Sequence, residues 1–215
     1  MAMNYIEKIN TTHLDILKEF GNIGAGHAAT ALSTLLNKQI DMKVPSARIV
    51  SFNDMMEMAG GAEEEVVSVS LRIEGEVTGN MFFVLSLRQA ESFISNMTGD
   101  RAFSFKEAGE KSIGLSAMQE LGNILSGSYL SALGDFTRLQ IYPSVPELAI
   151  DMFGAIISYG LVESSQYGDY AIVIETILKE VQAGYTDEMK GHFFLLPDPL
   201  SFGPIFEALG VGLNE

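Results

Sequence analysis

The chain has 215 residues, of which 47% are hydrophobic and 19% are charged, and this composition is typical of a globular protein with one sizeable core or two small ones. The formal net charge of −15 disfavours binding to nucleic acids and to anionic membrane surfaces, which are themselves negatively charged. Cysteine is absent, so disulfides and thiolate metal sites are excluded. The three histidines, His13, His27 and His192, are too scattered to favour a histidine metal site.

The sequence contains no uninterrupted apolar stretch of about eighteen residues, so it predicts no transmembrane helix. The N-terminal residues lack the basic start and the apolar segment of a signal peptide. We therefore expect a cytoplasmic protein. The acidic composition favours solubility and basic partners.

An internal repeat is the most informative feature of the sequence. Residues 14–33 align with residues 115–134 at an offset of 101. At the same offset Pro45 aligns with Pro146, and 22 residues separate each Pro from the Asn of its own copy. The identical pairs are Leu14 and Leu115, Glu19 and Glu120, Gly21 and Gly122, Asn22 and Asn123, Ile23 and Ile124, Gly26 and Gly127, Ala31 and Ala132, and Leu32 and Leu133.

The similarity continues into strand-like and helix-like segments. The run Glu65–Ile73 alternates apolar and polar residues, which predicts a strand, and its counterpart is Tyr170–Leu178. Next, Gly79–Leu85 aligns with Lys190–Leu196 at an offset of 111, so the second half has gained about ten residues, which we place near Val162–Asp169. A helix-like segment then closes each half, at residues 87–98 and 201–209.

The repeated segments predict two long helices, each with one polar and one apolar side. On a helix, residues three apart are neighbours on one face, so Glu19 and Asn22 point the same way. Glu120 and Asn123 share the equivalent face of the second helix. We therefore expect each motif helix to bury its apolar side and to present a Glu/Asn pair.

Four further motif positions accompany these pairs. Asp15 and Ser116 lie one turn before each Glu, and they either take a minor part in the site or are solvated first-turn residues or helix caps. Pro45 and Pro146 are expected to end a connection and to start a strand, so that they shape the site without touching a substrate.

Glycines occur inside both motif helices, at Gly21, Gly24, Gly26, Gly122 and Gly127. Each costs roughly 1 kcal/mol relative to alanine in a helix interior, so something must require the missing side chain. Two interpretations stay open, and both can hold together. Either two helices pack closely at these positions, or a partner approaches closely beside the Asn.

These observations predict an α+β fold in which the two long motif helices pack with an antiparallel β-sheet. The junction between the halves is short and has no Pro- or Ser-rich linker. A repeated unit that cannot cover its own apolar face will bury that face against its copy. We therefore expect a single compact domain over residues 1–215, built of tandem repeats at about 10–99 and 111–210 with internal pseudo-twofold symmetry.

The chemistry of a Glu/Asn pair is limited. An Asn carboxamide is neither a base nor a nucleophile, but it donates and accepts hydrogen bonds and can orient a water molecule. A Glu carboxylate can pair with a cation. Such a face is incomplete as an independent hydrolase, but it suffices when a partner protein brings an aspartyl-phosphate with its own metal ion and lysine, because only an in-line water is then needed.

The pattern (D/S)-x3-E-x2-N-x22-P, present twice at one offset, resembles the signature of the chemotaxis phosphatases of the CheC, CheX and FliY family. Its first copy is Asp15, Glu19, Asn22 and Pro45, and its second copy is Ser116, Glu120, Asn123 and Pro146. The resemblance covers essentially the whole chain. Two complete motifs, with no room for another domain before the chain ends at Glu215, are most similar to the CheC branch of the family.

The resemblance implies an aspartyl-phosphate phosphatase that acts on phosphorylated CheY, the chemotaxis response regulator. It implies that the two Asn residues orient the attacking water in the regulator's active site and that the two Glu residues contact the regulator's lysine. The magnesium ion would belong to the regulator, so no cofactor of the chain's own is expected. The receptor deamidase CheD is implied as a second partner, and we expect a monomer when the protein is free.

An alternative is a non-catalytic adaptor that binds CheD or a component of the flagellar switch. Both motifs are complete, which argues against decay of the catalytic faces. A metal hydrolase is disfavoured because cysteine is absent and the histidines are scattered. Asp151 follows an apolar stretch, and we hypothesise that it lies on an edge available to a partner.

Overall fold

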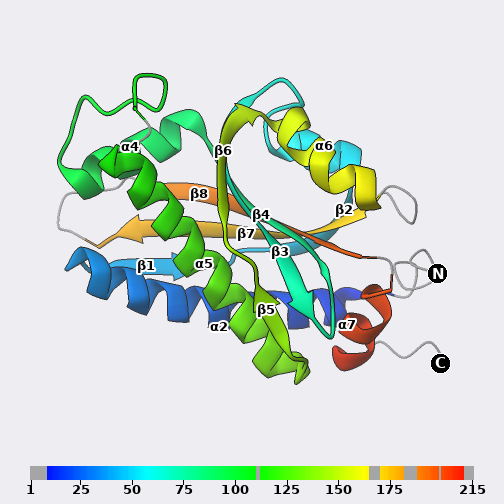
Figure 1. Cartoon of the computed structure of the whole chain (residues 1–215). Coiled ribbons are helices and arrows are strands. Elements are labelled where there is room, and N and C mark those ends of the chain that lie inside the picture. Colours follow the sequence, from blue (N-terminus) through cyan, green and yellow to red (C-terminus); the bar gives the residue numbers. More distant parts are fainter. Residues whose placement is uncertain (1–8, 110–111, 165–169, 182–187, 199, 211–215) are drawn as a thin grey trace.

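We describe a computed structural model of the chain, which defines residues 9–109, 112–164, 170–181, 188–198 and 200–210. Helices and strands are interspersed, which confirms the predicted α+β class (Figure 1). The first half contains α2 (Thr11–Leu36), β1 (Ile40–Lys43), β2 (Ala47–Ser51), α3 (Phe52–Met58), β3 (Glu65–Gly75), β4 (Gly79–Ser86) and α4 (Leu87–Thr98). The second half contains α5 (Ile113–Thr137), β5 (Ile141–Pro143), β6 (Glu147–Met152), α6 (Phe153–Ser164), β7 (Tyr170–Glu180), β8 (Glu188–Pro197) and α7 (Phe202–Ala208).

The two long helices, α2 and α5, are the predicted motif helices, and both extend beyond the repeated segments. The side chain of Asn10 caps the start of α2, and that of Ser112 caps the start of α5. Asp15 and Ser116 lie farther along these helices, so the interpretation of either as a helix cap is wrong. Within the described residues, no helix is both long enough and apolar enough to cross a membrane.

All strands that the structure describes belong to one antiparallel sheet of eight strands. The long strands β7, β8, β4 and β3 form its centre, and the pairing of β4 with β8 joins the two halves. The short strands cross over at the edges. β1 and β2 of the first half pair with β7, whereas β5 and β6 of the second half pair with β3. Each half therefore completes its part of the sheet with strands from the other.

The strand pairing corrects the predicted alignment of β4 with β8. Val69 lies opposite Phe83 in the β3–β4 hairpin, and Ile174 lies opposite Phe193 in the β7–β8 hairpin. Because Val69 and Ile174 are 105 residues apart, Phe83 corresponds to Phe193 at an offset of 110, and the predicted 111 is wrong by one. The additional residues of the second half are therefore divided between the α6 region and the β7–β8 connection. The prediction had placed all of them near Val162–Asp169, and residues 165–169 of that range lie outside the described part.

Two apolar cores lie on opposite faces of the sheet. The larger core packs α2, α5, α4 and α7 against one face, and the smaller core packs α3 and α6 against the other (Figure 1). Phe83 and Phe193 stack in the larger core with ring centroids 4.7 Å apart, while Phe82 and Phe194 belong to the smaller one. All four are buried, so β4 and β8 contribute aromatic side chains to the cores on both faces of the sheet. Neither α3 nor α6 was predicted from the sequence.

The glycines of the motif helices serve different purposes. A Cβ atom at Gly24 would lie 3.0 Å from Tyr129 Cα and 3.2 Å from Ser128 O, so α2 and α5 cross with their backbones close together. Close helix packing therefore explains Gly24. A Cβ atom at Gly26 or Gly127 would meet nothing within 4 Å, so close packing does not explain these two positions.

Gly24→Val is expected to lower the free energy of unfolding by about 1–3 kcal/mol, because the added side chain forces α2 away from α5. Gly26→Ala is the matched control in the same helix. Its methyl group has free space, so we expect a gain of roughly 0.5–1 kcal/mol from the better helix propensity of alanine. Urea denaturation followed by circular dichroism measures both changes, and similar effects of the two substitutions would contradict the close crossing.

Candidate active site

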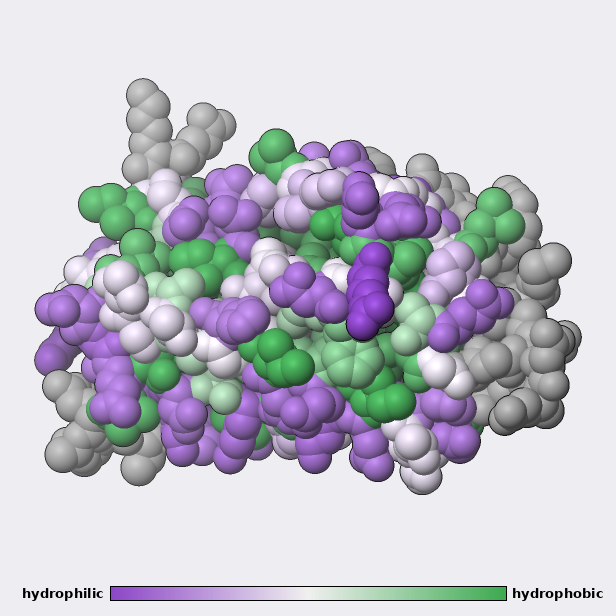
Figure 2. Space-filling model, turned by 90° about the horizontal axis from the view of Figure 1, so that it is seen from below, coloured by the Kyte–Doolittle hydropathy of each residue, from purple (hydrophilic) through white to green (hydrophobic). Residues whose placement is uncertain are grey.

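Both Glu/Asn pairs lie on the outer side of the motif helices. Glu19 is exposed and Asn22 is half-buried on α2, while Glu120 and Asn123 are both exposed on α5. Neither Glu forms an ion pair with any residue that the structure describes. Figure 2 shows the molecule from below, where hydrophilic residues surround small hydrophobic patches. Both carboxylates are therefore available to a cation on a partner.

The loop between β1 and β2 closes on the first Asn. The backbone N–H of Val44 donates a hydrogen bond to Asn22 Oδ1 at 3.0 Å. The Val44 side chain is 2% exposed and lies beneath the helix, where a Cβ atom at Gly21 would be 3.3 Å from it. Pro45 follows, exposed, and is separated from the start of β2 at Ala47 by Ser46. The hydrogen bond turns the carboxamide oxygen of Asn22 toward the chain's own backbone.

The loop between β5 and β6 contains the same Val-Pro dipeptide in a different arrangement. Val145 is 81% exposed, and Val69 lies beneath α5, so close that a Cβ atom at Gly122 would be 2.4 Å from it. Gln119 ties this loop to α5, because its Nε2 donates a hydrogen bond to Pro146 O at 3.2 Å. The loop is thus held to the helix by a residue other than the motif Asn.

The structure brings each set of motif residues together around one helix and one loop. Pro146 directly precedes β6 and Pro45 lies two residues before the first residue of β2, so each ends a connection just before a strand. In the described part of the chain, no hydrogen bond reaches the side chain of Asn123, in contrast to Asn22. The role of the Val44 N–H could not be predicted from the sequence, since a backbone donor has no side-chain signature. Gln119 was not predicted either, because it lies outside the identical positions of the repeat.

Asp151 lies on β6, an edge strand that pairs with β3, and its side chain is exposed. The predicted position of this residue on an edge is therefore confirmed. It lines a cavity of about 690 Å³ together with residues of β3, β4 and α6 and with Val145 of the β5–β6 loop. Its strand neighbour Val66 packs in the core beneath α3 and α6, so Asp151 lies on the side of the sheet away from α2 and α5, while the cavity reaches the loop that carries Pro146.

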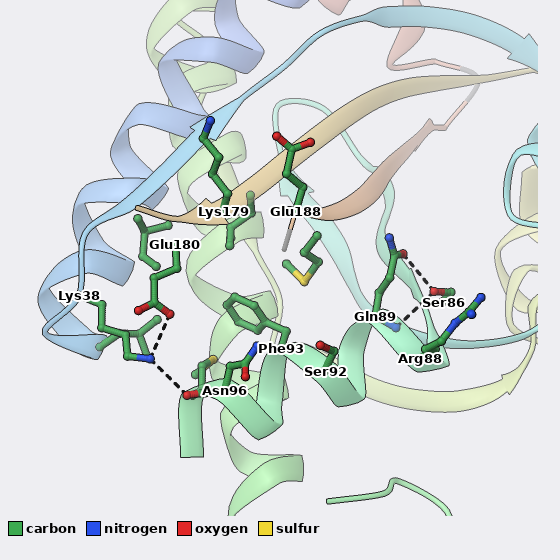
Figure 3. Close-up of a pocket in the computed structure, with 15 residues that line it drawn as sticks. Lys38, Ser86, Arg88, Gln89, Ser92, Phe93, Asn96, Lys179, Glu180 and Glu188 are labelled. Atoms are coloured by element: carbon green, nitrogen blue, oxygen red, sulfur yellow. Dashed lines mark hydrogen bonds and ion pairs between the residues drawn. The ribbon is translucent and has the colours of Figure 1, made fainter. Parts of the chain in front are cut away.

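A second cavity, of about 460 Å³, opens between α4 and the ends of β7 and β8. Figure 3 shows Phe93 on one wall and an ion pair on another, in which Lys38 Nζ lies 3.0 Å from Glu180 Oε2. Lys38 also donates a hydrogen bond to Asn96 O at 3.2 Å. None of the predicted site residues lines this cavity, so it is not part of either Glu/Asn face.

The described residues contain no group of three or more His, Asp or Glu side chains that could hold a metal ion. One histidine is half-buried in a polar cluster on the sheet. His192 on β8 lies opposite Glu175 on β7, and Glu175 pairs with Arg48 at 2.9 Å. Burial lowers the pKa of His192, Glu175 acts to raise it, and Arg48 acts to lower it.

Residues 13–49 and 113–150 match the model of the CheC-like family, and each segment contains one complete Glu/Asn motif with its Pro. The chain is 49% identical over 211 residues to "CheY-P phosphatase CheC" of Bacillus subtilis (strain 168). The aligned region covers 98% of this chain and 100% of that protein.

Among solved structures, the chain is similar to Thermotoga maritima FliY, with a TM-score of 0.73, 22% identity, and coverage of 94% of this chain and 98% of that one. It is also similar to a chain in the CheX-CheY-BeF3-Mg complex of Borrelia burgdorferi, with a TM-score of 0.52, 16% identity, and coverage of 81% and 96%. At these identities the two structures support the fold alone.

The His192 imidazole is expected to make stability depend on pH. Its pKa lies below 6.5 in the folded chain, so the unfolded chain binds this proton more tightly, and stability falls as the pH is lowered from about 6.5 toward the folded-state value. In His192→Gln this loss disappears. Urea midpoints at about pH 7.5 and about pH 5.5 should therefore differ less for the variant than for the parent chain. An unchanged difference would assign the loss to other groups.

Proposed function

The chain belongs to the CheC-like family, and from this premise we propose that it is a phosphatase acting on phosphorylated CheY, with its two Glu/Asn faces as the catalytic groups. The similarity to CheY-P phosphatase CheC, 49% identical over nearly the whole chain, carries the activity. The catalytic role of the faces is supported by their geometry. Each presents a carboxylate without an ion-pair partner among the described residues, next to a carboxamide on the same side of a helix.

In the proposed mechanism the regulator supplies the aspartyl-phosphate, the magnesium ion and an active-site lysine, and this chain has no cofactor of its own. Glu19 or Glu120 pairs with the lysine and fixes the orientation of the two proteins. Asn22 or Asn123 then enters the regulator's site, and its Oδ1 accepts a hydrogen bond from the attacking water. The water is thereby held in line with the phosphorus–oxygen bond that breaks.

Asn22→Ala combined with Asn123→Ala is expected to reduce the acceleration of regulator dephosphorylation to background, because neither face can then orient the water. Phosphate release from phosphorylated CheY in excess magnesium measures this activity. The exposed positions Thr34 and Ser131 lie on the same two helices, and Thr34→Ala with Ser131→Ala is the matched control that should remain active. Circular dichroism verifies that both double variants are folded, and a folded, active Asn double variant would contradict the mechanism.

We further propose that residues 1–215 form one domain that arose by tandem duplication of a unit spanning about 10–99 and 111–210, with pseudo-twofold symmetry. The edge pairings support this proposal. Ala47 pairs with Ile174, and Leu148, which is 101 residues after Ala47, pairs with Val69. The two edges thus use corresponding registers. Since each half lends its short strands to the other, neither half has a complete sheet alone, and we propose a cytoplasmic protein that is monomeric when free.

We propose CheD as a second partner, docking on the surface around Asp151. The edge position of β6 and the neighbouring cavity of about 690 Å³ support a docking role for this surface. The cavity reaches the loop that carries Pro146, but Asp151 lies on the side of the sheet away from α2 and α5, so a partner docked at Asp151 leaves the Glu/Asn pairs on these helices accessible to the regulator. A pure adaptor would bind CheD through the same strand but would leave the rate of phosphate release unchanged.

Asp151→Lys is expected to weaken CheD binding at least about tenfold, since it reverses an exposed charge at the centre of the proposed surface. Asp135→Lys makes the same charge change at an exposed position on α5 and is the matched control. Isothermal titration calorimetry with purified CheD measures both variants. Equal affinity of the two variants for CheD would remove Asp151 from the interface, and the basal phosphatase activity of each verifies that the faces are intact.

A further inference from the structure

We propose that the two Glu/Asn faces contribute unequally to the dephosphorylation. Different residues form the hydrogen bond, here called the tether, that holds the loop of Pro45 and the loop of Pro146 to the motif helices. In the first copy the tether uses the motif residue Asn22, whereas in the second copy Gln119 supplies the tether and leaves Asn123 free. The second face therefore carries the larger share of the dephosphorylation. This inference rests on the proposed function, since it concerns how the same two faces divide one reaction.

The carboxamide oxygen is the atom that decides the difference. In the proposed mechanism Oδ1 must point into the regulator's site and accept a hydrogen bond from the water. Asn22 is half-buried and its Oδ1 already accepts the Val44 N–H at 3.0 Å, so that bond must be broken or shared when the face engages. Asn123 is exposed, and its Oδ1 accepts no hydrogen bond from any residue that the structure describes. The net value of one hydrogen bond corresponds to a factor of roughly three to ten.

Both loops are fixed to the sheet in other ways, so the tether to the helix is a separate feature. Ser46 O accepts a hydrogen bond from Glu175 N at 3.0 Å in the first loop. Ser144 Oγ accepts one from Arg72 N at 2.9 Å in the second loop. Each loop can thus keep its place on the sheet if its bond to the motif helix is lost.

Gln119 is therefore a positioning residue and not a catalytic one. It lies next to Glu120, and its amide reaches the loop at Pro146 O, 3.2 Å away. At the corresponding position, 101 residues earlier, the first copy has Lys18, which makes no hydrogen bond to the Pro45 loop in the described structure. Without the Gln119 tether, the second loop has no bond to α5 except one that it could form with Asn123 itself, as the first loop does with Asn22.

The first test compares the single variants Asn22→Ala and Asn123→Ala in phosphate release from phosphorylated CheY. We expect Asn22→Ala to keep most of the activity and Asn123→Ala to retain roughly three- to tenfold less than Asn22→Ala. Equal activities, or a larger loss in Asn22→Ala, would overturn the inference while leaving the proposed function intact. An active Asn22→Ala, Asn123→Ala double variant would instead overturn the proposed function.

The second test adds Gln119→Met to Asn22→Ala, so that all activity comes from the second face and the side chain keeps its length without its amide. We expect kcat to fall about threefold, while the affinity for CheY loaded with beryllofluoride and magnesium changes little. Lys18→Met in the Asn123→Ala background is the matched control at the corresponding position, and no change is expected there. An unchanged kcat for the Gln119 variant, or an equal fall in the control, would exclude Gln119 as a positioning residue.

The third test removes the hydrogen bond between the Val44 N–H and Asn22 Oδ1 on the first face without altering any side chain. An ester bond at Val44, introduced with the α-hydroxy acid that matches valine, deletes the N–H that Asn22 Oδ1 accepts. In the Asn123→Ala background we expect the remaining activity to rise about threefold or more, because Asn22 is released. A fall in activity in a chain that circular dichroism reports as folded would show that the Val44 bond aids the first face, and would overturn the inference.

Discussion

The exchange of short strands between the halves is the constraint on which the rest of the structure depends. β1 and β2 pair with β7 of the second half, and β5 and β6 pair with β3 of the first. These short strands follow directly after the motif helices, so the exchange also determines what lies beneath each helix. Gly21 of the first half packs on Ile174 of the second half, and Gly122 of the second half packs on Val69 of the first half. Each Glu/Asn face is therefore built from both halves of the chain.

This construction explains why the motif helices could be predicted from the sequence while other elements could not. Glu19 and Asn22 owe their common face to spacing on one helix, which is a local property, and the repeat doubles the signal. α3 and α6 are short or uniformly apolar segments whose helical form depends on packing against the far face of the sheet. The register of β8 was misjudged by one residue because an offset of 111 superposes both residues of the Phe-Phe pairs at 82–83 and 193–194, whereas the offset of 110 superposes only one. Strand pairing decides between the two, since a shift of one residue moves every side chain to the other face.

The candidate site follows the same division. The four Glu and Asn residues were predicted from spacing, but the difference between the two loops has no signal in the sequence, because Val44-Pro45 and Val145-Pro146 are identical dipeptides. Their opposite burial has a tertiary cause. Beneath α2 there is room for Val44 beside Ile174, whereas Val69 lies so close under Gly122 that little space is left for Val145 beneath α5. A contact with the other half of the chain thus determines whether a valine is 2% or 81% exposed.

The incomplete chemistry of the faces makes such small differences consequential. A face with its own base, nucleophile or metal ion would have its rate set mainly by those groups. In the mechanism that we propose, a Glu/Asn face contributes a charge contact and an oriented hydrogen bond, so its effectiveness depends on where one carboxamide oxygen points when the regulator arrives. Two faces with identical motif pairs can then differ in rate through a single backbone N–H. In this proposal the hydrogen bond between each loop and its motif helix contributes to catalysis by setting the position of the carboxamide, although it supplies no reacting group.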